Sequence, residues 1–151
     1  MAYTIRRVDY FYTTIEHEPG EAYELLSQLA ALGINMHAFT AVPLGPERLQ
    51  LALFPEDPRK LMDSANKARV LLDGPHRAIL VQGDDELGAL AEIHSKLSRA
   101  NVDVYASTAV ADGRGTYGYL IYVRPDEYER AAEALSMGRD SLQETGRAKQ
   151  P

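Results

Sequence analysis

The chain contains an internal duplication. Residues 18–42 align without a gap on residues 86–110, at a shift of 68 positions, and nine of the 25 aligned positions are identical. The identical pairs are Glu18/Glu86, Gly20/Gly88, Glu24/Glu92, Ser27/Ser95, Leu29/Leu97, Ala38/Ala106, Thr40/Thr108, Ala41/Ala109 and Val42/Val110. Unrelated segments share roughly one or two residues over such a length, so the duplication predicts two related halves. Halves of about seventy residues lie near the lower limit for an independent core, so we expect an extensive interface between the halves or with a second copy.

Each half shows the same order of local signals. In the first half, residues 8–14 are rich in aromatic and β-branched residues, which is typical of a strand. A Pro-Gly break follows, and then Leu25, Leu26, Leu29 and Leu32 recur at helical spacing until Gly33, which predicts an inward-facing helix. Residues 34–42 and 48–54 predict a hairpin around a turn at residues 43–46, and Asp57 with Pro58 predicts the start of a second helix.

The second half repeats this order. Residues 77–82 predict a strand, and Leu90, Ile93 and Leu97 predict the apolar face of a helix. Residues 102–110 and 116–123 predict a hairpin with a glycine-rich loop, and a last helix carries Tyr128.

This order predicts the α+β class, with two ferredoxin-like βαββαβ repeats whose antiparallel sheets are covered by helices on one face. We place the first domain at residues 6–73, the second at 76–136 and a flexible polar tail at 137–151, with residues 73–75 as the linker. The last strand of each repeat has no clear signal. Residues 69–72 either supply it in the first repeat or end the second helix.

Composition excludes several classes of function. The net charge of −6 and the estimated pI of 5.2 argue against nucleic acid or an anionic membrane as a partner. The chain has no cysteine, which excludes disulfides, a thiolate nucleophile and a cysteine-type zinc site. No segment resembles a secretory signal or a membrane span, so we expect a cytoplasmic protein.

No cofactor is expected. Residues 113–118 match the dinucleotide-binding pattern GxGxxG, but they lead into a predicted strand where that pattern must lead into a helix. His17 and His37, with Glu16 and Glu18, have no spacing that requires a metal, so no metal site is predicted.

The turn, helix and second strand resemble the ACT domain, a small ligand-sensing module of amino-acid metabolism. The resemblance rests on Glu18-Pro19-Gly20 and on Gly33-Ile34-Asn35-Met36. The second copy departs from the pattern, because Glu86-Leu87-Gly88 lacks the proline and Asn101-Val102-Asp103-Val104 has aspartate where asparagine is usual. The two copies cover residues 6–136, so the resemblance is to a tandem ACT protein.

The resemblance implies that a free amino acid or a related metabolite binds where domains meet. It implies one wall formed by His17, Glu18, Pro19 and Gly20, and another formed by Asn35 and Met36. The chemistry agrees, because a helix N-terminus attracts a carboxylate while Glu18 or the Asn35 amide oxygen can accept from an ammonium group. The corresponding residues of the second copy are Asp84, Asp85, Gly88 and Asp103. Their three carboxylates favour a cationic group or leave that site vacant.

These residues also have plain structural explanations. Gly20 and Gly88 can serve the turn alone, and Asn35 and Asp103 can satisfy nearby backbone groups.

Three functions follow as hypotheses. The first is a non-enzymatic sensor that forms a homodimer and acts on an enzyme or regulator in another polypeptide. The second is a ferredoxin-like α/β-barrel dimer enzyme of the haem or oxygenase type, using His94 or His37. The third is a protein-interaction module without a ligand.

Overall fold

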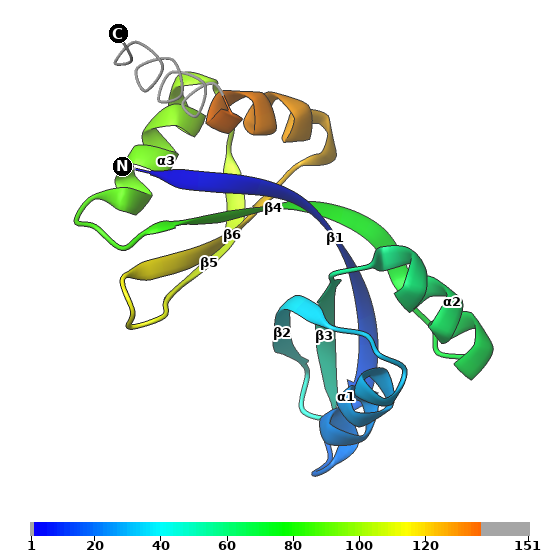
Figure 1. Cartoon of the computed structure of the whole chain (residues 1–151). Helices are drawn as coiled ribbons and strands as arrows, with labels where there is room; N and C mark the ends of the chain where they lie inside the picture. The colour runs from blue at the N-terminus through cyan, green and yellow to red at the C-terminus, as the bar shows by residue number, and fades with distance from the viewer. Residues whose placement is uncertain (1, 137–151) are drawn as a thin grey trace, which may run out of the picture. The chain divides into compact units, whose positions relative to one another are not determined.

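The structure is a computed structural model that describes residues 2–136, and these residues form two compact units. One unit is Asp9–His76, called here the first unit. The second unit combines the residues up to Val8 with those from Arg77 onward. The strands β1 (Tyr3–Glu16) and β4 (Asp73–Asp84) are long, and each contributes residues to both units (Figure 1). Residues 73–75, where the sequence predicts a linker, begin the strand β4.

The first unit contains the second part of β1, α1 (Glu21–Ala31), β2 (Met36–Leu44), β3 (Arg48–Pro55), α2 (Pro58–Ala68) and the start of β4. Its strand order is β2-β3-β1-β4, with β3 antiparallel to both β2 and β1. Leu29 of α1 and Leu61 of α2 pack with Phe11, Leu51 and Leu53 in one core. Both helices thus cover the same face of this sheet. The α+β class is confirmed.

The second unit contains β4 from Arg77 onward, α3 (Ala89–Arg99), β5 (Val104–Ala111), β6 (Thr116–Val123), the short 3-10 helix η1 (Pro125–Glu127) and helical residues 128–136. Its strand order is β5-β6-β4-β1. Ile93 and Leu97 of α3 pack with Ile79, Ile121 and Leu135 in its core. The predicted tail at 137–151 lies outside the described residues.

The N-terminal strand completes the second unit. Asp84 N donates to Ala2 O at 3.2 Å, and the buried Tyr3 hydroxyl donates to Leu135 O at 2.7 Å. Lys96 Nζ donates to the same hydroxyl at 2.7 Å. Residues 69–72, for which helix and strand were both open, form neither: Arg69 lies in a turn and the next three residues are irregular.

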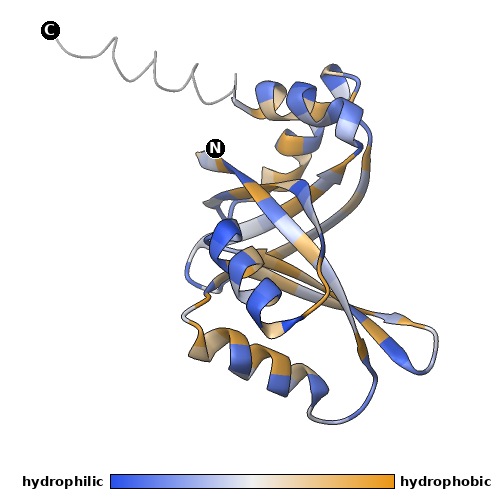
Figure 2. Cartoon of the chain, turned by 90° about the vertical axis from the view of Figure 1, so that its right-hand side faces the viewer, coloured by the Kyte–Doolittle hydropathy of each residue, from blue (hydrophilic) through white to orange (hydrophobic). Residues whose placement is uncertain are grey.

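Local signals account for the helix ends. Asp57 accepts a hydrogen bond from Lys60 N at 3.1 Å and Pro58 opens α2, as predicted. Gly33, with φ of +74°, follows the end of α1. Hydrophobic and hydrophilic residues alternate along the helices and strands (Figure 2). None of the helices within residues 2–136 is both long and apolar enough to cross a membrane.

Candidate functional site

The loop between β1 and α1 holds four of the predicted ligand residues. Gly20 is the N-cap of α1 with φ of +92°, and an added Cβ would meet nothing within 4 Å. The backbone conformation therefore explains this glycine without any close approach. His17, Glu18 and Pro19 are exposed, and His17 N donates to Glu47 O at 2.8 Å.

No side chain caps α1 or α3, whereas Asp57 caps α2. Gly88 is the N-cap of α3 with φ of +84°, which matches Gly20 on α1. The first turns of α1 and α3 thus lack the side-chain acceptor that usually satisfies their amides. Glu21 N donates to Glu18 O at 3.3 Å and Ala89 N donates to Glu86 O at 3.1 Å, so the amides left to donate to an anion are those that follow in each first turn.

At the start of β2, Asn35 makes local contacts. Asn35 Nδ2 donates to Glu56 Oε1 at 2.9 Å, and Glu56 N donates to Asn35 O at 2.9 Å. Met36 is half-buried and packs against the core of the first unit. The amide nitrogen of Asn35 therefore has a structural role, while its Oδ1 can still accept a hydrogen bond.

Gly20 and Asn35 lie at opposite ends of α1. This helix has 11 residues, so its length is about 16 Å. The structure does not bring the two predicted walls together inside the first unit. A cleft that uses both walls needs a second surface next to α1.

In the second unit the predicted residues lie along three different cavities. Asp85 and Gly88 line a cavity of about 630 Å³ beside the start of α3. Asp103 lines a cavity of about 490 Å³ near the end of α3, and Asp84 lines one of about 430 Å³ next to Ala2. These four residues do not share one cavity, and α3 separates Gly88 from Asp103 as α1 separates Gly20 from Asn35.

The cavity at Asp103 is also lined by His94, the histidine named for the enzyme alternative. His94 is exposed, and its Nε2 lies 2.5 Å from the Tyr119 hydroxyl. Glu127 also lines this cavity and receives a hydrogen bond from Arg130 Nη2 at 3.2 Å. The cavity therefore combines an imidazole with two carboxylates, those of Asp103 and Glu127, and Glu127 is partly neutralised by Arg130.

Tyr117 of β6 is a further residue whose pKa is shifted by burial. Burial raises the pKa of Tyr117 above its usual value of 10.0, and the nearby Glu92 carboxylate raises it further. Tyr117 lines both the cavity at Gly88 and the cavity at Asp84. Tyrosine is common in strands, so the sequence does not distinguish a tyrosine that lines a cavity from one that only packs in the core.

Apolar side chains are exposed along the two outermost strands and the helices α1 and α3. Leu26 and Leu32 were predicted to face inward, but 36% and 47% of their surface is exposed, because only part of the apolar stripe of α1 meets the sheet. Tyr23 on α1 and Phe39 and Val42 on β2 are exposed as well. In the second unit the exposed set is Leu87, Leu90, Tyr105 and Val110.

Comparison with known proteins gives likenesses of fold. No family model matches the sequence, and no curated protein matches it. A crystal structure of a protein from Bacteroides thetaiotaomicron has a TM-score of 0.75 and 18% identity, over 89% of this chain and 90% of that one. The ligand-free regulatory subunit of aspartate kinase from Thermus thermophilus has a TM-score of 0.61 and 15% identity, over 89% and 95% of the two chains. The corresponding subunit from Thermus flavus has a TM-score of 0.57 and 15% identity, over 90% and 94%. The fold is thus similar to that of the regulatory subunits of aspartate kinase.

Proposed function

We propose that this protein is a non-catalytic sensor, built from two ACT-like βαββαβ repeats, that binds a free amino acid or a related metabolite. The repeats correspond to the predicted domains at 6–73 and 76–136, with residues 3–8 of β1 completing the second one. The bound state would be transmitted to an enzyme or regulator on another polypeptide.

The strand order supports two repeats. In the first unit the order is β2-β3-β1-β4 and in the second it is β5-β6-β4-β1. If β4 is counted as the first strand of the second unit and the N-terminal part of β1 as its fourth, both orders read second, third, first, fourth. The likeness to the regulatory subunits of aspartate kinase supports a regulatory role for such a fold.

The separation of Gly20 and Asn35 along α1 is the observation that carries the site. A two-fold axis perpendicular to α1 would place the N-terminus of α1 in one copy beside the C-terminus of α1 in the other. Gly20 of one copy would then face Asn35 of the other, and two equivalent clefts would form. Tyr23 and Leu26 on α1 and Phe39 on the outermost strand β2 are exposed apolar residues, which supports a homodimer there.

The ligand chemistry follows from the two walls. The uncapped first turn of α1 offers amides to a carboxylate, and Asn35 Oδ1 or the Glu18 carboxylate accepts from an ammonium group. The surroundings of α3 are acidic because of Asp84, Asp85 and Asp103, and this favours a ligand with a cationic group. The two kinds of site would differ in ligand.

Thermal unfolding with each of the twenty amino acids at millimolar concentration tests the proposal. A ligand present at about 100 times its Kd stabilises the folded state by about 2.7 kcal/mol, which raises the unfolding temperature. Asn35→Ala should abolish the response, while Asn66→Ala, an exposed asparagine on α2, should keep it. No response to any amino acid would contradict the sensor proposal.

A ligand-free interaction module is the second candidate, since the exposed apolar edges favour association by themselves. It predicts a dimer whose unfolding temperature does not respond to amino acids, whereas the sensor predicts a dimer whose unfolding temperature rises when its amino acid is added. The haem or oxygenase alternative predicts a coloured preparation. The contact between His94 and Tyr119 gives that histidine a partner without haem.

A further inference from the structure

The strand β1 extends further than its neighbour β4 in the first unit. On one side β1 pairs with β3 to its end, with Thr14 opposite Gln50 and Glu16 opposite Arg48. On the other side β4 begins only at Asp73. A Cβ on Gly74 would lie 2.8 Å from Tyr10 O, so the first residues of β4 lie beside Tyr10 and Phe11. Within the described residues, no strand covers positions 12–16 of β1 on this side.

The backbone of Thr14 and Glu16 points to this uncovered side. His17 N donates to Glu47 O, across the hairpin that continues the pairing of β1 with β3. Backbone groups of alternate residues in a strand point to opposite edges, so Thr13 and Ile15 share the direction of His17. Thr14 and Glu16 point the other way, as does Tyr10 O. Their amides and carbonyls form a strand edge that can pair with another chain.

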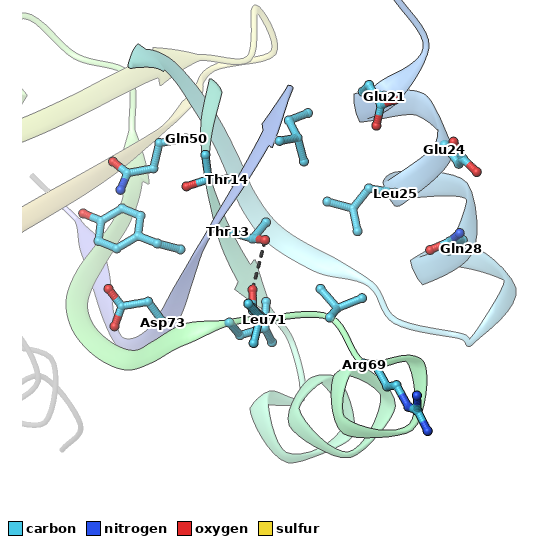
Figure 3. A pocket seen from close by; sticks show the side chains of 14 residues that line it. Thr13, Thr14, Glu21, Glu24, Leu25, Gln28, Gln50, Arg69, Leu71 and Asp73 are labelled. Atoms are coloured by element: carbon cyan, nitrogen blue, oxygen red, sulfur yellow. Dashed lines mark hydrogen bonds between the residues drawn. The ribbon is translucent and has the colours of Figure 1, made fainter. Parts of the chain in front are cut away.

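The segment after α2 leaves this edge open. Arg69 has a left-handed conformation with φ of +56°, and Val70 N donates back to Ala65 O at 2.9 Å. Leu71 O then accepts from the Thr13 hydroxyl at 3.1 Å (Figure 3). Among the described residues, no backbone hydrogen bond joins residues 69–72 to residues 12–16 of β1. The Leu71 side chain is 90% exposed, so it offers apolar surface at the edge.

A groove of about 790 Å³ follows the open edge. On its helix side, Leu25 points from α1 toward Thr13, and Glu21 and Glu24 lie on the same helix (Figure 3). On the other side are Thr14, Gln50 and Asp73 (Figure 3). Arg69, the cation among the lining residues, points away from Thr13 (Figure 3). Three carboxylates and exposed apolar surface therefore surround a row of backbone donors and acceptors.

We propose that residues 12–16 of β1 bind an extended peptide from another polypeptide by strand addition. The five residues span about 17 Å, which matches a short strand. Peptide side chains that face α1 would meet Leu25, Glu21 and Glu24, and those on the other face would meet Asp73, so the peptide carries both apolar and basic residues. A free amino acid has one carboxylate and one ammonium group and cannot pair with a row of backbone groups. The peptide site is separate from the proposed amino-acid site and does not depend on it.

Amide hydrogen exchange resolved by residue gives a direct test. The probe is an end-blocked peptide of about seven alternating valine and lysine residues, long enough to cover the edge. Its addition should slow exchange at Thr14 and Glu16 and leave Thr13 and Ile15, which already face β3, unchanged. A matching peptide of valine and glutamate should have no effect. Unchanged exchange at Thr14 and Glu16 with the lysine peptide would overturn the proposal.

Two variants separate strand pairing from general attraction to an acidic protein. Thr14→Pro removes an edge N–H, and proline is tolerated at outward-facing edge positions. We expect it to weaken binding by at least about tenfold, measured by fluorescence anisotropy of the labelled peptide. The double change Glu21→Lys and Glu24→Lys should weaken binding while leaving exchange of the other amides unaltered.

Glu133→Lys, an exposed glutamate of the second unit, is the charge control and should bind as the wild type does. Equal loss in this control would show attraction by net charge and contradict the strand site. A change in self-association of Thr14→Pro without peptide would show that a second copy covers the edge, which also overturns the proposal. Because no amino acid is present in these measurements, their result is independent of the thermal test above.

Discussion

Gly83 lies where the backbone of β4 comes close to the N-terminal strand. A Cβ at this position would be 2.8 Å from Ala2 O and 2.8 Å from Tyr3 Cβ. Ala2 O is a backbone atom that accepts from Asp84 N, and Tyr3 Cβ is attached to the backbone of β1, so neither atom can rotate away. Gly83→Ala should therefore separate the two strands and lower the free energy of unfolding by about 1–3 kcal/mol, measured by urea denaturation.

Gly118→Ala is the matched control, since a Cβ on this strand glycine would meet nothing within 4 Å. We expect it to leave stability unchanged or to raise it by up to about 1 kcal/mol, because alanine restricts the unfolded chain. Equal destabilisation of both variants would contradict the close approach at Gly83.

Asp112 organises the hairpin between β5 and β6. The hydroxyl of Thr116 and the amides of Arg114 and Thr116 donate to its carboxylate and hold the pKa of Asp112 below its usual value of 3.8. A lowered pKa in the folded state adds stability above pH 3.8, and this contribution is lost as the pH falls through the folded-state pKa.

Asp112→Asn should therefore be less stable than the wild type at neutral pH, and the difference should shrink as the pH falls below 3.8. Urea midpoints of both proteins across this range measure the effect. Because the carboxylate is exposed, we expect a small difference. A difference that does not vary with pH would show that the charge of Asp112 plays no part.

At the scale of elements, the N-terminal part of β1 has the clearest consequence. Tyr3 is buried in the core of the second unit, and its hydroxyl bonds to Leu135 O and Lys96 Nζ. Removal of the residues before Val8 should expose β4 and destabilise the second unit by several times the effect of Tyr3→Phe. The point variant should cost about 1–2 kcal/mol, because it leaves packing intact and removes two hydrogen bonds.

Amide hydrogen exchange measures the stability of each unit separately. Truncation should speed exchange in α3 and β6 more than in α1 and β3, which belong to the first unit. Tyr3→Phe serves as the mild comparison in the same experiment. Uniform acceleration across both units would indicate that the chain unfolds as one cooperative body.

At the scale of the whole molecule, the exposed edge strand β2 predicts self-association. Phe39 and Val42 are 38% and 48% exposed at the outermost position of the strand order. Replacing both with lysine should convert the dimer to a monomer, because two charges on each copy would have to be desolvated. Sedimentation or light scattering gives the mass.

Met62→Lys is the control, since Met62 is 40% exposed on α2, away from β2. This variant should remain a dimer. If dimerisation forms the amino-acid cleft, the Phe39 and Val42 double variant should also lose its thermal response to ligand. A wild type that stays monomeric at all concentrations would contradict this assembly.

Local chemistry explains how much of the fold could be predicted. Pro58 after Asp57, Gly33 at positive φ and the glycine-rich loop at 113–115 are signals between near neighbours in the chain, and α2, the end of α1 and the hairpin of β5 and β6 occur where these signals lie. The observed strand β2 begins and ends two residues later than the predicted strand at 34–42. Its pairing with β3 continues through Pro43 and Leu44, which the sequence placed in the turn.

The order of helices and strands, and the candidate ligand residues at the helix starts and strand starts, could be predicted from local patterns of residues. The place of Tyr3 in the core of the second unit, the strand at residues 73–75 and the separation of Gly20 from Asn35 by α1 became visible in the folded chain. Turns and caps depend on residues a few positions apart, whereas strand neighbours and cavities join residues far apart in the chain, which no local pattern specifies.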